Sequence, residues 1–208
     1  MEKDNILLSS ACFPPIEYFM VATNSDLIII ENSENYIKQT YRNRFTILSG
    51  NGLLSIIVPV VHHSTKMPIK EVCIDYKTNW NFSAIKSIKS AYQNSPFFLY
   101  YKDQFLPFFQ KKYKYLFDYN CEITFLLFKL LNISCSVIYT ENYQKKLPNV
   151  VDYREIITPK NSMDLNYPFR NLVPYKQVFD DRFSFMTNLS ILDLIFNLGP
   201  ESGSYIKK

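Results

Sequence analysis

Two short apolar runs near the amino terminus have the pattern of strands that are buried on both faces. They cover Ile6–Ser10 and residues 26–31, and the second is rich in β-branched side chains without polar alternation. Between them, Pro15 suits the first turn of a helix over about residues 15–23, because a proline there loses no donor that the helix needs. The first 31 residues therefore predict a β-α-β order.

A further pair of apolar runs predicts a β-hairpin. The run Phe45–Leu48 is separated from Leu53–Val61 by Gly50-Asn51-Gly52. Glycine reaches positive φ without steric cost, so this tripeptide is a typical hairpin turn. A hairpin at this place argues against an all-parallel, doubly wound sheet.

The rest of the chain predicts several helices and a late strand. Helical spacing of apolar residues begins after Thr78 or Asn79 and ends at Ser95-Pro96. The other expected elements are a polar loop over 62–70, a strand over 71–76, helices over 97–117 (bent at Pro107), 120–131 and 191–198, a strand over 136–140, and an irregular proline-containing segment over 141–181. We expect one mixed α/β domain over residues 1–208, with helices around a central mixed sheet that contains the hairpin.

Composition and charge exclude several classes of protein. A net charge of +4 over 208 residues is too mild, and its lysines too scattered, to predict nucleic-acid binding. Met1–Asn5 lacks the features of a signal peptide, and the apolar stretch Ile123–Leu131 is too short to span a bilayer. The cysteines at positions 12, 73, 121 and 135 are isolated, as expected of reduced, mostly buried thiols in a cytoplasmic protein.

Common cofactor and metal motifs are also missing from the sequence. The 4 glycines, at positions 50, 52, 199 and 203, form neither a dinucleotide-binding fingerprint nor a P-loop. His62 and His63 are adjacent and have no neighbouring cysteine, which gives a zinc site little support. No Gly-x-Ser-x-Gly motif occurs. We therefore expect no cofactor and no metal.

The segment Tyr36–Arg44, with the sequence YIKQTYRNR, concentrates three cations in nine residues. On a strand, alternate residues would place Lys38, Arg42 and Arg44 on one face, together with Thr40, and Gln39, Tyr41 and Asn43 on the other. A guanidinium can bind a carboxylate or phosphate with two hydrogen bonds. The segment is either an anion-binding strip or a solvated edge strand whose charges prevent aggregation.

A second group of candidates surrounds the last predicted helix. Ser190 and Asp193 have the spacing of a capping box, and a helix amino terminus also binds anions. Asn188 could bind a ligand or close the turn, and the tyrosines at 18 and 92 could present hydroxyls to a substrate or lie at the edge of the core. The candidate substrate-binding residues are thus Tyr18, Lys38, Arg42, Asn43, Arg44, Tyr92, Asn188, Ser190 and Asp193.

An ordered set of motifs over nearly the whole chain resembles the WbqC-like protein family of bacteria. The motifs are residues 10–19 (SACFPPIEYF), YIKQTYRNR, the VPV at 58–60, the block from Trp80 to Phe98, and residues 188–194 (NLSILDL). Members often occur with genes for surface-polysaccharide biosynthesis, and some are described as candidate glycine transferases. The resemblance implies a cytoplasmic transferase of O-antigen assembly that passes an acyl or aminoacyl group from an activated donor to an amino-sugar nucleotide.

The chain departs from this family at one position that bears on catalysis. Relatives usually carry a histidine shortly after the tryptophan, whereas here the chain continues to Ala84. If that histidine is a general base, His62 or His63 would have to replace it. A non-catalytic anion-binding protein, or an interaction partner of an envelope-assembly enzyme, is therefore the alternative. Anion binding predicts that Lys38, Arg42 and Arg44 converge with Asn188 and the last helix on one pocket.

Overall fold

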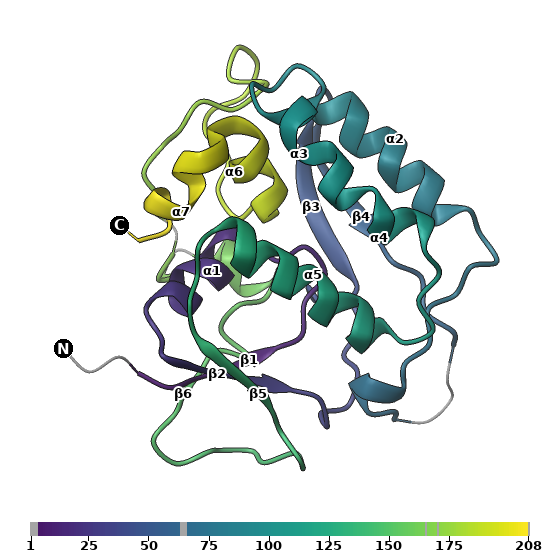
Figure 1. Cartoon of the computed structure of the whole chain (residues 1–208), viewed down its shortest axis with the longest axis vertical. Helices are drawn as coiled ribbons and strands as arrows, with labels where there is room; N and C mark the ends of the chain where they lie inside the picture. The colour runs from purple at the N-terminus through teal and green to yellow at the C-terminus, as the bar shows by residue number, and fades with distance from the viewer. Residues whose placement is uncertain (1–3, 63–65, 165, 170, 208) are drawn as a thin grey trace.

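The computed structural model describes residues 4–62, 66–164, 166–169 and 171–207 (Figure 1). Four parallel strands form one sheet in the order β5-β2-β1-β6. Their bounds are β1 Ile6–Ser9, β2 Leu27–Glu31, β5 Ser136–Tyr139 and β6 Val151–Asp152. The two strands predicted near the amino terminus pair in register, with Ile6 opposite Ile28 and Ser9 opposite Glu31. The mixed α/β class is confirmed.

Two helices lie over the same face of this sheet. Helix α1 (Ile16–Thr23) connects β1 to β2, and α5 (Leu116–Leu130) leads into β5 (Figure 1). Pro15 is the residue before the first helical turn, in an extended conformation with φ −70° and ψ 165°. The side chains of Ile6, Leu8 and Ile28 pack into the core beneath these helices.

The predicted hairpin forms, although as a sheet of its own. Strands β3 (Arg44–Ser49) and β4 (Gly52–Ile57) pair antiparallel, and the turn has φ 101° at Gly52. The Ser49 hydroxyl donates to the Gly52 carbonyl at 2.8 Å and closes the turn. The hairpin therefore stands beside the parallel sheet instead of joining it.

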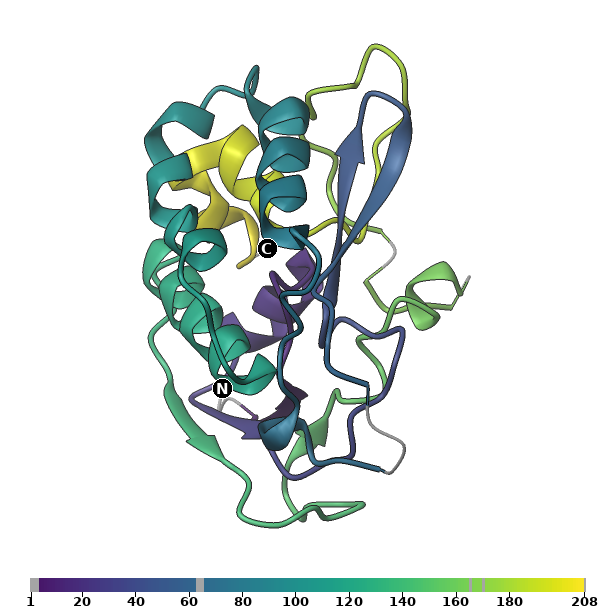
Figure 2. The same cartoon turned by 90° about the vertical axis from the view of Figure 1, so that its right-hand side faces the viewer.

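The remaining helices pack around the hairpin. Helix α2 contacts β3 and α4, and α3 contacts α4 and α6; Figure 2 shows the hairpin on one side of α2 and α3 on the other. The bounds are α2 Trp80–Tyr92, α3 Phe98–Phe105, α4 Pro107–Gln110, α6 Ile191–Leu198 and α7 Ser202–Tyr205, with short 3₁₀ turns at Ile69–Glu71, Asn161–Met163 and Gly199–Glu201. In the described part of the chain, no helix is both long and apolar enough to cross a membrane.

Three expected elements differ in the structure. The strand expected over 71–76 is reduced to isolated bridges, because Cys73 pairs with Tyr115 whereas Ile74 pairs with Val60 in another segment. The helix expected over 97–117 ends at Gln110, and α5 begins earlier than expected, at Leu116. The segment 141–181, expected to be irregular, contributes β6 to the sheet.

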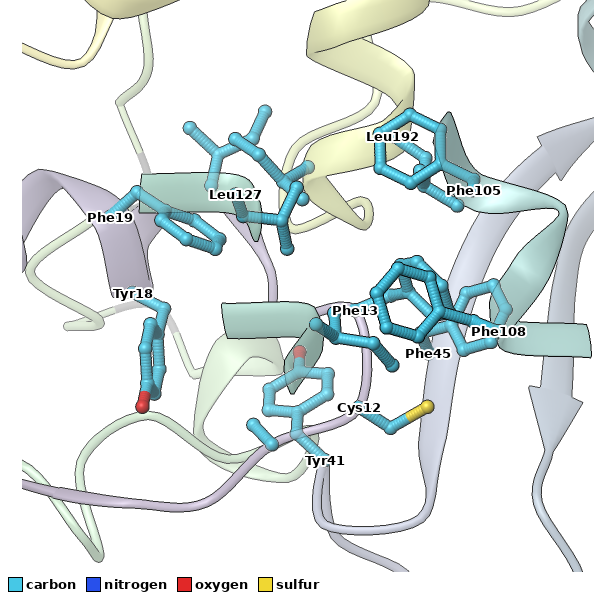
Figure 3. Packing of buried hydrophobic residues seen from close by; sticks show 14 of the residues in the cluster. Cys12, Phe13, Tyr18, Phe19, Tyr41, Phe45, Phe105, Phe108, Leu127 and Leu192 are labelled. Atoms are coloured by element: carbon cyan, nitrogen blue, oxygen red, sulfur yellow. The ribbon is translucent and has the colours of Figure 1, made fainter. Parts of the chain in front are cut away.

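Many aromatic rings from different elements pack against one another in the core. The Phe13 ring lies 5.0 Å from Phe45, centroid to centroid (Figure 3). It also stacks on Phe109, with centroids 5.5 Å apart. Cys12 and Cys121 are buried, as expected, while the other two cysteines are half-buried. The aromatic abundance thus serves packing first.

Candidate functional site

The carboxyl ends of the four parallel strands lie at one edge of the sheet. Strand β1 ends at Ser9, β2 at Glu31 and β6 at Asp152, and Thr140 directly follows β5. Ligands of open parallel sheets bind outside this edge, where the loops that follow the strands leave a crevice. The polar residues of the edge therefore define the place to look for a site.

Glu31 and Arg154 form a buried ion pair at this edge. Glu31 is fully buried and accepts from Nη1 of Arg154 at 2.8 Å and from the Thr140 hydroxyl at 2.6 Å. Arg154 also donates through Nε and Nη2 to the two carboxylate oxygens of Asp152, at 3.0 and 2.7 Å. Two carboxylates thus balance one buried guanidinium, and the pair ties β2 to β6 across the sheet.

Arg42 forms a second buried ion pair beside the first. Its Nε and Nη2 donate to the two oxygens of Glu34 at 2.8 and 2.6 Å, and Nη2 also donates to the Ser9 hydroxyl at 2.6 Å. Both side chains are buried, with 4% and 6% exposed. The fork that we expected to bind a ligand is therefore occupied by a carboxylate of the same chain.

The cationic segment is a loop and not the expected strand. Residues 38–43 form successive turns and bends, and β3 begins only at Arg44. Gln39 has φ 62°, a left-handed conformation that ends any extended run. The Thr40 hydroxyl donates to the Ile37 carbonyl at 2.8 Å within the turn. The alternation expected along this segment is consequently lost.

A large cleft opens over these two ion pairs, with a volume of about 1010 Å³. It is walled by the segments that follow three of the parallel strands: residues 34–38 after β2, 143–147 after β5 and 152–156 at the end of β6. Four exposed lysines line it, none of them in an ion pair with a described residue: Lys38, Lys66, Lys145 and Lys146.

The acids of the cleft do not neutralise these lysines. Glu34 and Asp152 are held by the two buried arginines, which leaves Glu155 as the lining acid without an ion pair to a described residue. The cleft therefore has an excess of positive charge, which raises the local concentration of anions.

Two tyrosine rings add flat apolar surface to the cleft. The ring centre of Tyr143 lies 5.2 Å from the guanidinium carbon of Arg154. Tyr36 lines the cleft from the segment that follows β2. Nη2 of Arg154 donates to the carbonyls of Gln144 and Lys145 at 3.0 and 3.2 Å. The buried arginine thereby fixes the segment that carries two of the lysines.

A small cavity of about 10 Å³ lies next to the cleft, in the crevice between β1 and β6. The strand order changes direction there, since the chain places β2 and β6 on opposite sides of β1. Arg42 and Arg154 line both spaces. Tyr18 lines the cavity too, but its hydroxyl donates to the Ser9 carbonyl at 3.2 Å. The cavity has room for about one water molecule.

Glu17 is a buried acid close to this cavity. One of its oxygens accepts from the Tyr167 hydroxyl at 3.0 Å, and the other has no hydrogen-bond partner among the described residues. Burial raises the pKa of Glu17 to about 7. Tyr41 lines the cavity, and the pKa of its hydroxyl is raised by burial and then by Glu17. The sequence pattern of α1 did not indicate that Glu17 is buried, because a single carboxylate does not alter an apolar stripe.

The structure separates the expected cationic residues. Lys38 is exposed on the cleft, whereas Arg44 lies in β3 away from it, with its Nε buried and without a partner among the described residues. Asn43 is buried and donates to the Val58 carbonyl at 2.9 Å. Lys38 and Arg42 thus meet at one cleft, and the expected convergence with Arg44 and Asn188 is wrong, because the segment is a loop.

The start of the last helix belongs to the core. Ser190 caps α6 by accepting from Leu192 N at 3.4 Å, and its hydroxyl donates to the Phe13 carbonyl at 2.9 Å. The other half of the expected capping box does not form, because Ser190 N donates to the Thr46 carbonyl at 2.8 Å instead of to Asp193. The anion-binding end that we expected is therefore enclosed.

Asp193, in the first turn of α6, and Tyr92, at the end of α2, are both buried. Asp193 accepts from the Tyr175 hydroxyl at 2.5 Å and from Gln177 Nε2 at 3.0 Å, and burial raises its pKa. Burial and then the Asp193 carboxylate raise the pKa of Tyr92. Asn188 has φ 60° and donates to the Ser162 carbonyl at 3.3 Å. None of these three expected site residues lines the cleft.

No histidine of the described residues lines the cleft, so none there can replace the histidine that relatives usually carry after the tryptophan. His62 is exposed and does not line the cleft, His63 falls outside the described residues, and Ala84 is buried within α2. The charged residues of the cleft that sequence patterns missed are Glu34, Lys66, Lys145, Lys146, Asp152, Arg154 and Glu155. Glu31, which accepts from Arg154 and Thr140, was missed as well. Their signal is positional: acids and hydroxyls at the ends of parallel strands converge, which requires knowing that residues 151–152 form a strand.

Comparison with known proteins places the chain in a family. The profile of the WbqC-like protein family matches residues 10–166. The chain belongs to this family. It is also 26% identical to "Uncharacterized protein Rv1507c" of Mycobacterium tuberculosis (strain ATCC 25618 / H37Rv), over 99% of this chain and 98% of the relative. No solved structure matches this chain.

The WbqC-like region contains the whole lining of the cleft, which runs from Glu34 to Ile156. It ends before Asn188, Ser190 and Asp193.

Proposed function

We propose that this WbqC-like protein is a transferase that binds a phosphate-bearing molecule in the cleft at the carboxyl edge of its sheet. The observation that carries this proposal is the set of four exposed lysines around the cleft, without ion pairs to described residues. Ammonium groups bind phosphate as point charges, and a parallel-sheet edge is a common place for such ligands.

The reaction that fits best is the transfer of an acyl or aminoacyl group to an amino-sugar nucleotide in bacterial surface-polysaccharide biosynthesis. Tyr36 and Tyr143 offer flat surfaces for a sugar or base ring. The acceptor amine must lose a proton during acyl transfer, and Glu155 is the acid of the cleft that is not already in an ion pair with a described residue. The lysines would stabilise the developing oxyanion.

A second candidate function is anion binding without catalysis. Carboxylates occupy both buried arginines, and no histidine of the described residues lines the cleft. These observations favour a protein that holds an anion without activating it. The two candidates share the ligand and differ in turnover.

Thermal-shift screening and calorimetry test the shared part of the proposal. Sugar nucleotides, pyrophosphate and aminoacyl-adenylate analogues should include a ligand that raises stability by about 2.7 kcal/mol at a hundredfold excess over its Kd. The double variant Lys145→Gln/Lys146→Gln should weaken that ligand about tenfold or more, which is about 1.4 kcal/mol. Lys129→Gln, at an exposed position of α5 outside the cleft, is the matched control.

Two results would count against the proposal in different ways. Equal affinities of the double variant and the control would remove the cleft as the binding site. If the ligand binds but no group transfer is detected, the non-catalytic function remains. If transfer occurs but Glu155→Gln leaves its rate unchanged, Glu155 is not the base.

A further inference from the structure

A second hollow, far from the cleft, lies between α2 and α3 and has a volume of about 490 Å³. We call it the helical groove. Its floor consists of buried apolar side chains from α2, α3, α4 and α6, namely Ile88, Phe98, Phe105, Phe109 and Phe196. It shares no lining residue with the cleft, and α2 and α3 lie at the top right of Figure 1, away from the strand ends at the bottom.

The floor of the helical groove is rigid and apolar. The ring of Phe196 lies 5.2 Å from Phe98 and 5.6 Å from Phe105, so that the three rings hold one another in place. An open groove with an apolar floor favours apolar ligands, because binding removes apolar surface from water. The half-buried side chains of Ile85 and Leu106 continue the same surface towards the opening.

The rim of the helical groove is positively charged. Lys89 is exposed at the opening and forms no ion pair with a described residue, and Lys102 lies across from it, paired with Asp103 at 2.8 Å. Helix α2 carries Lys86 and Lys89 but no acid over its whole length. An apolar hollow with an unpaired ammonium at its mouth is complementary to an apolar chain that ends in an anion.

We propose that the helical groove binds a single-chain fatty acid, with the alkyl chain on the phenylalanine floor and the carboxylate at Lys89. The groove is concave and its floor is buried, which suits a slender chain better than the flat face of a protein. The exposed Leu99, at 70% exposure, stands at the opening where an alkyl chain would cover it. This site is independent of the proposed transferase function.

Fluorescence quenching tests the proposal on the unmodified protein. Trp80 is the one tryptophan, and its ring lies 6.3 Å from Phe109 of the floor. Bromine quenches tryptophan at short range, so a dodecanoate brominated at its terminal carbon should quench Trp80 in a saturable manner, and plain dodecanoate should compete. Dodecyltrimethylammonium, with the same chain and a positive head, should bind about tenfold more weakly or worse.

Matched variants locate the site by calorimetry with dodecanoate. Ile85→Trp should fill the groove and weaken binding about tenfold or more, whereas Phe82→Trp, on the exposed side of the same helix, should not. Lys89→Glu should weaken binding at least several-fold through like-charge repulsion, and Lys86→Glu should have a much smaller effect. Both lysines are exposed, so these variants are expected to fold even if Ile85→Trp does not.

Three results would overturn the proposal. The brominated dodecanoate could fail to quench Trp80 to saturation, or the cationic surfactant could bind as well as the anion. Alternatively, the protein could form dimers that close the groove, so that Phe82→Trp and Leu99 variants change the oligomeric state while dodecanoate does not bind.

Discussion

At the scale of single residues, Arg42 shows how a binding motif becomes part of the architecture. Its bidentate contact with Glu34 is buried, and the same guanidinium reaches Ser9 at the end of β1. Breaking a buried, hydrogen-bonded ion pair is costly because the remaining charge loses its partner. Arg42 is therefore held within the wall of the cleft, whereas the four lysines are exposed to it.

Arg42→Lys should consequently destabilise the fold, whereas an arginine that served only to bind a ligand could be replaced with little effect on folding. An ammonium keeps the charge but cannot make both contacts to Glu34, so we expect the free energy of unfolding to fall by about 1–3 kcal/mol. Urea unfolding measures this change. The control is Arg182→Lys, since Arg182 is exposed and 3.8 Å from Asp181. A stable variant that loses its anionic ligand would instead restore Arg42 as a direct ligand contact.

Glu17 predicts how stability depends on pH. Its pKa is about 7 in the folded state and about 4.5, the ordinary value, when the chain unfolds. Between these values the folded state holds a proton that the unfolded state has released, so stability falls as pH rises through this window. The loss attributable to Glu17 between pH 4 and pH 8 is on the order of 3 kcal/mol.

The variant Glu17→Gln should remove that part of the pH dependence and raise stability above pH 7. The amide stays neutral and keeps the size of the side chain, so its benefit should vanish towards pH 4. Chemical denaturation across this range gives the curve, with the exposed Glu201→Gln as the control. An unchanged slope in the Gln variant would show that Glu17 titrates normally.

At the scale of elements, the sequence supported predictions wherever the pattern was local. The β-α-β start, the turn at Gly52, the helix from Trp80 and the last helix are confirmed, because apolar spacing and turn residues determine each of them locally. The hairpin was expected within the central sheet and forms its own sheet, since strand pairing between distant segments leaves no local signal.

The site was predictable only in part for the same reason. Lys38 was expected at an anion site and lines the cleft, and Arg42 lies beneath it. The partners that build the cleft come from residues 143–156, more than a hundred residues later, through the two-residue strand β6. So short a strand has no periodicity to detect, and with it Arg154 and its acids stayed hidden in a segment that was expected to be irregular.

At the scale of the whole molecule, the cleft and the helical groove are formed by different elements and share no lining residue. The cleft depends on the ends of the parallel strands, and the helical groove depends on α2, α3 and α6. Phe109 of the groove floor stacks on Phe13, which also packs against Phe45 of the hairpin. Any energetic coupling between the two sites would therefore involve these aromatic contacts.

We expect the two sites to be energetically independent. Interactions of separated groups that share no partners add to within about 0.5 kcal/mol. Pyrophosphate and dodecanoate, each at a hundredfold excess over its Kd, should each raise the free energy of unfolding by about 2.7 kcal/mol, and together by about twice that amount. Denaturation with neither, one or both ligands measures the sum. A combined gain that departs from additivity by more than about 1 kcal/mol would mean that the phenylalanine core transmits binding from one site to the other.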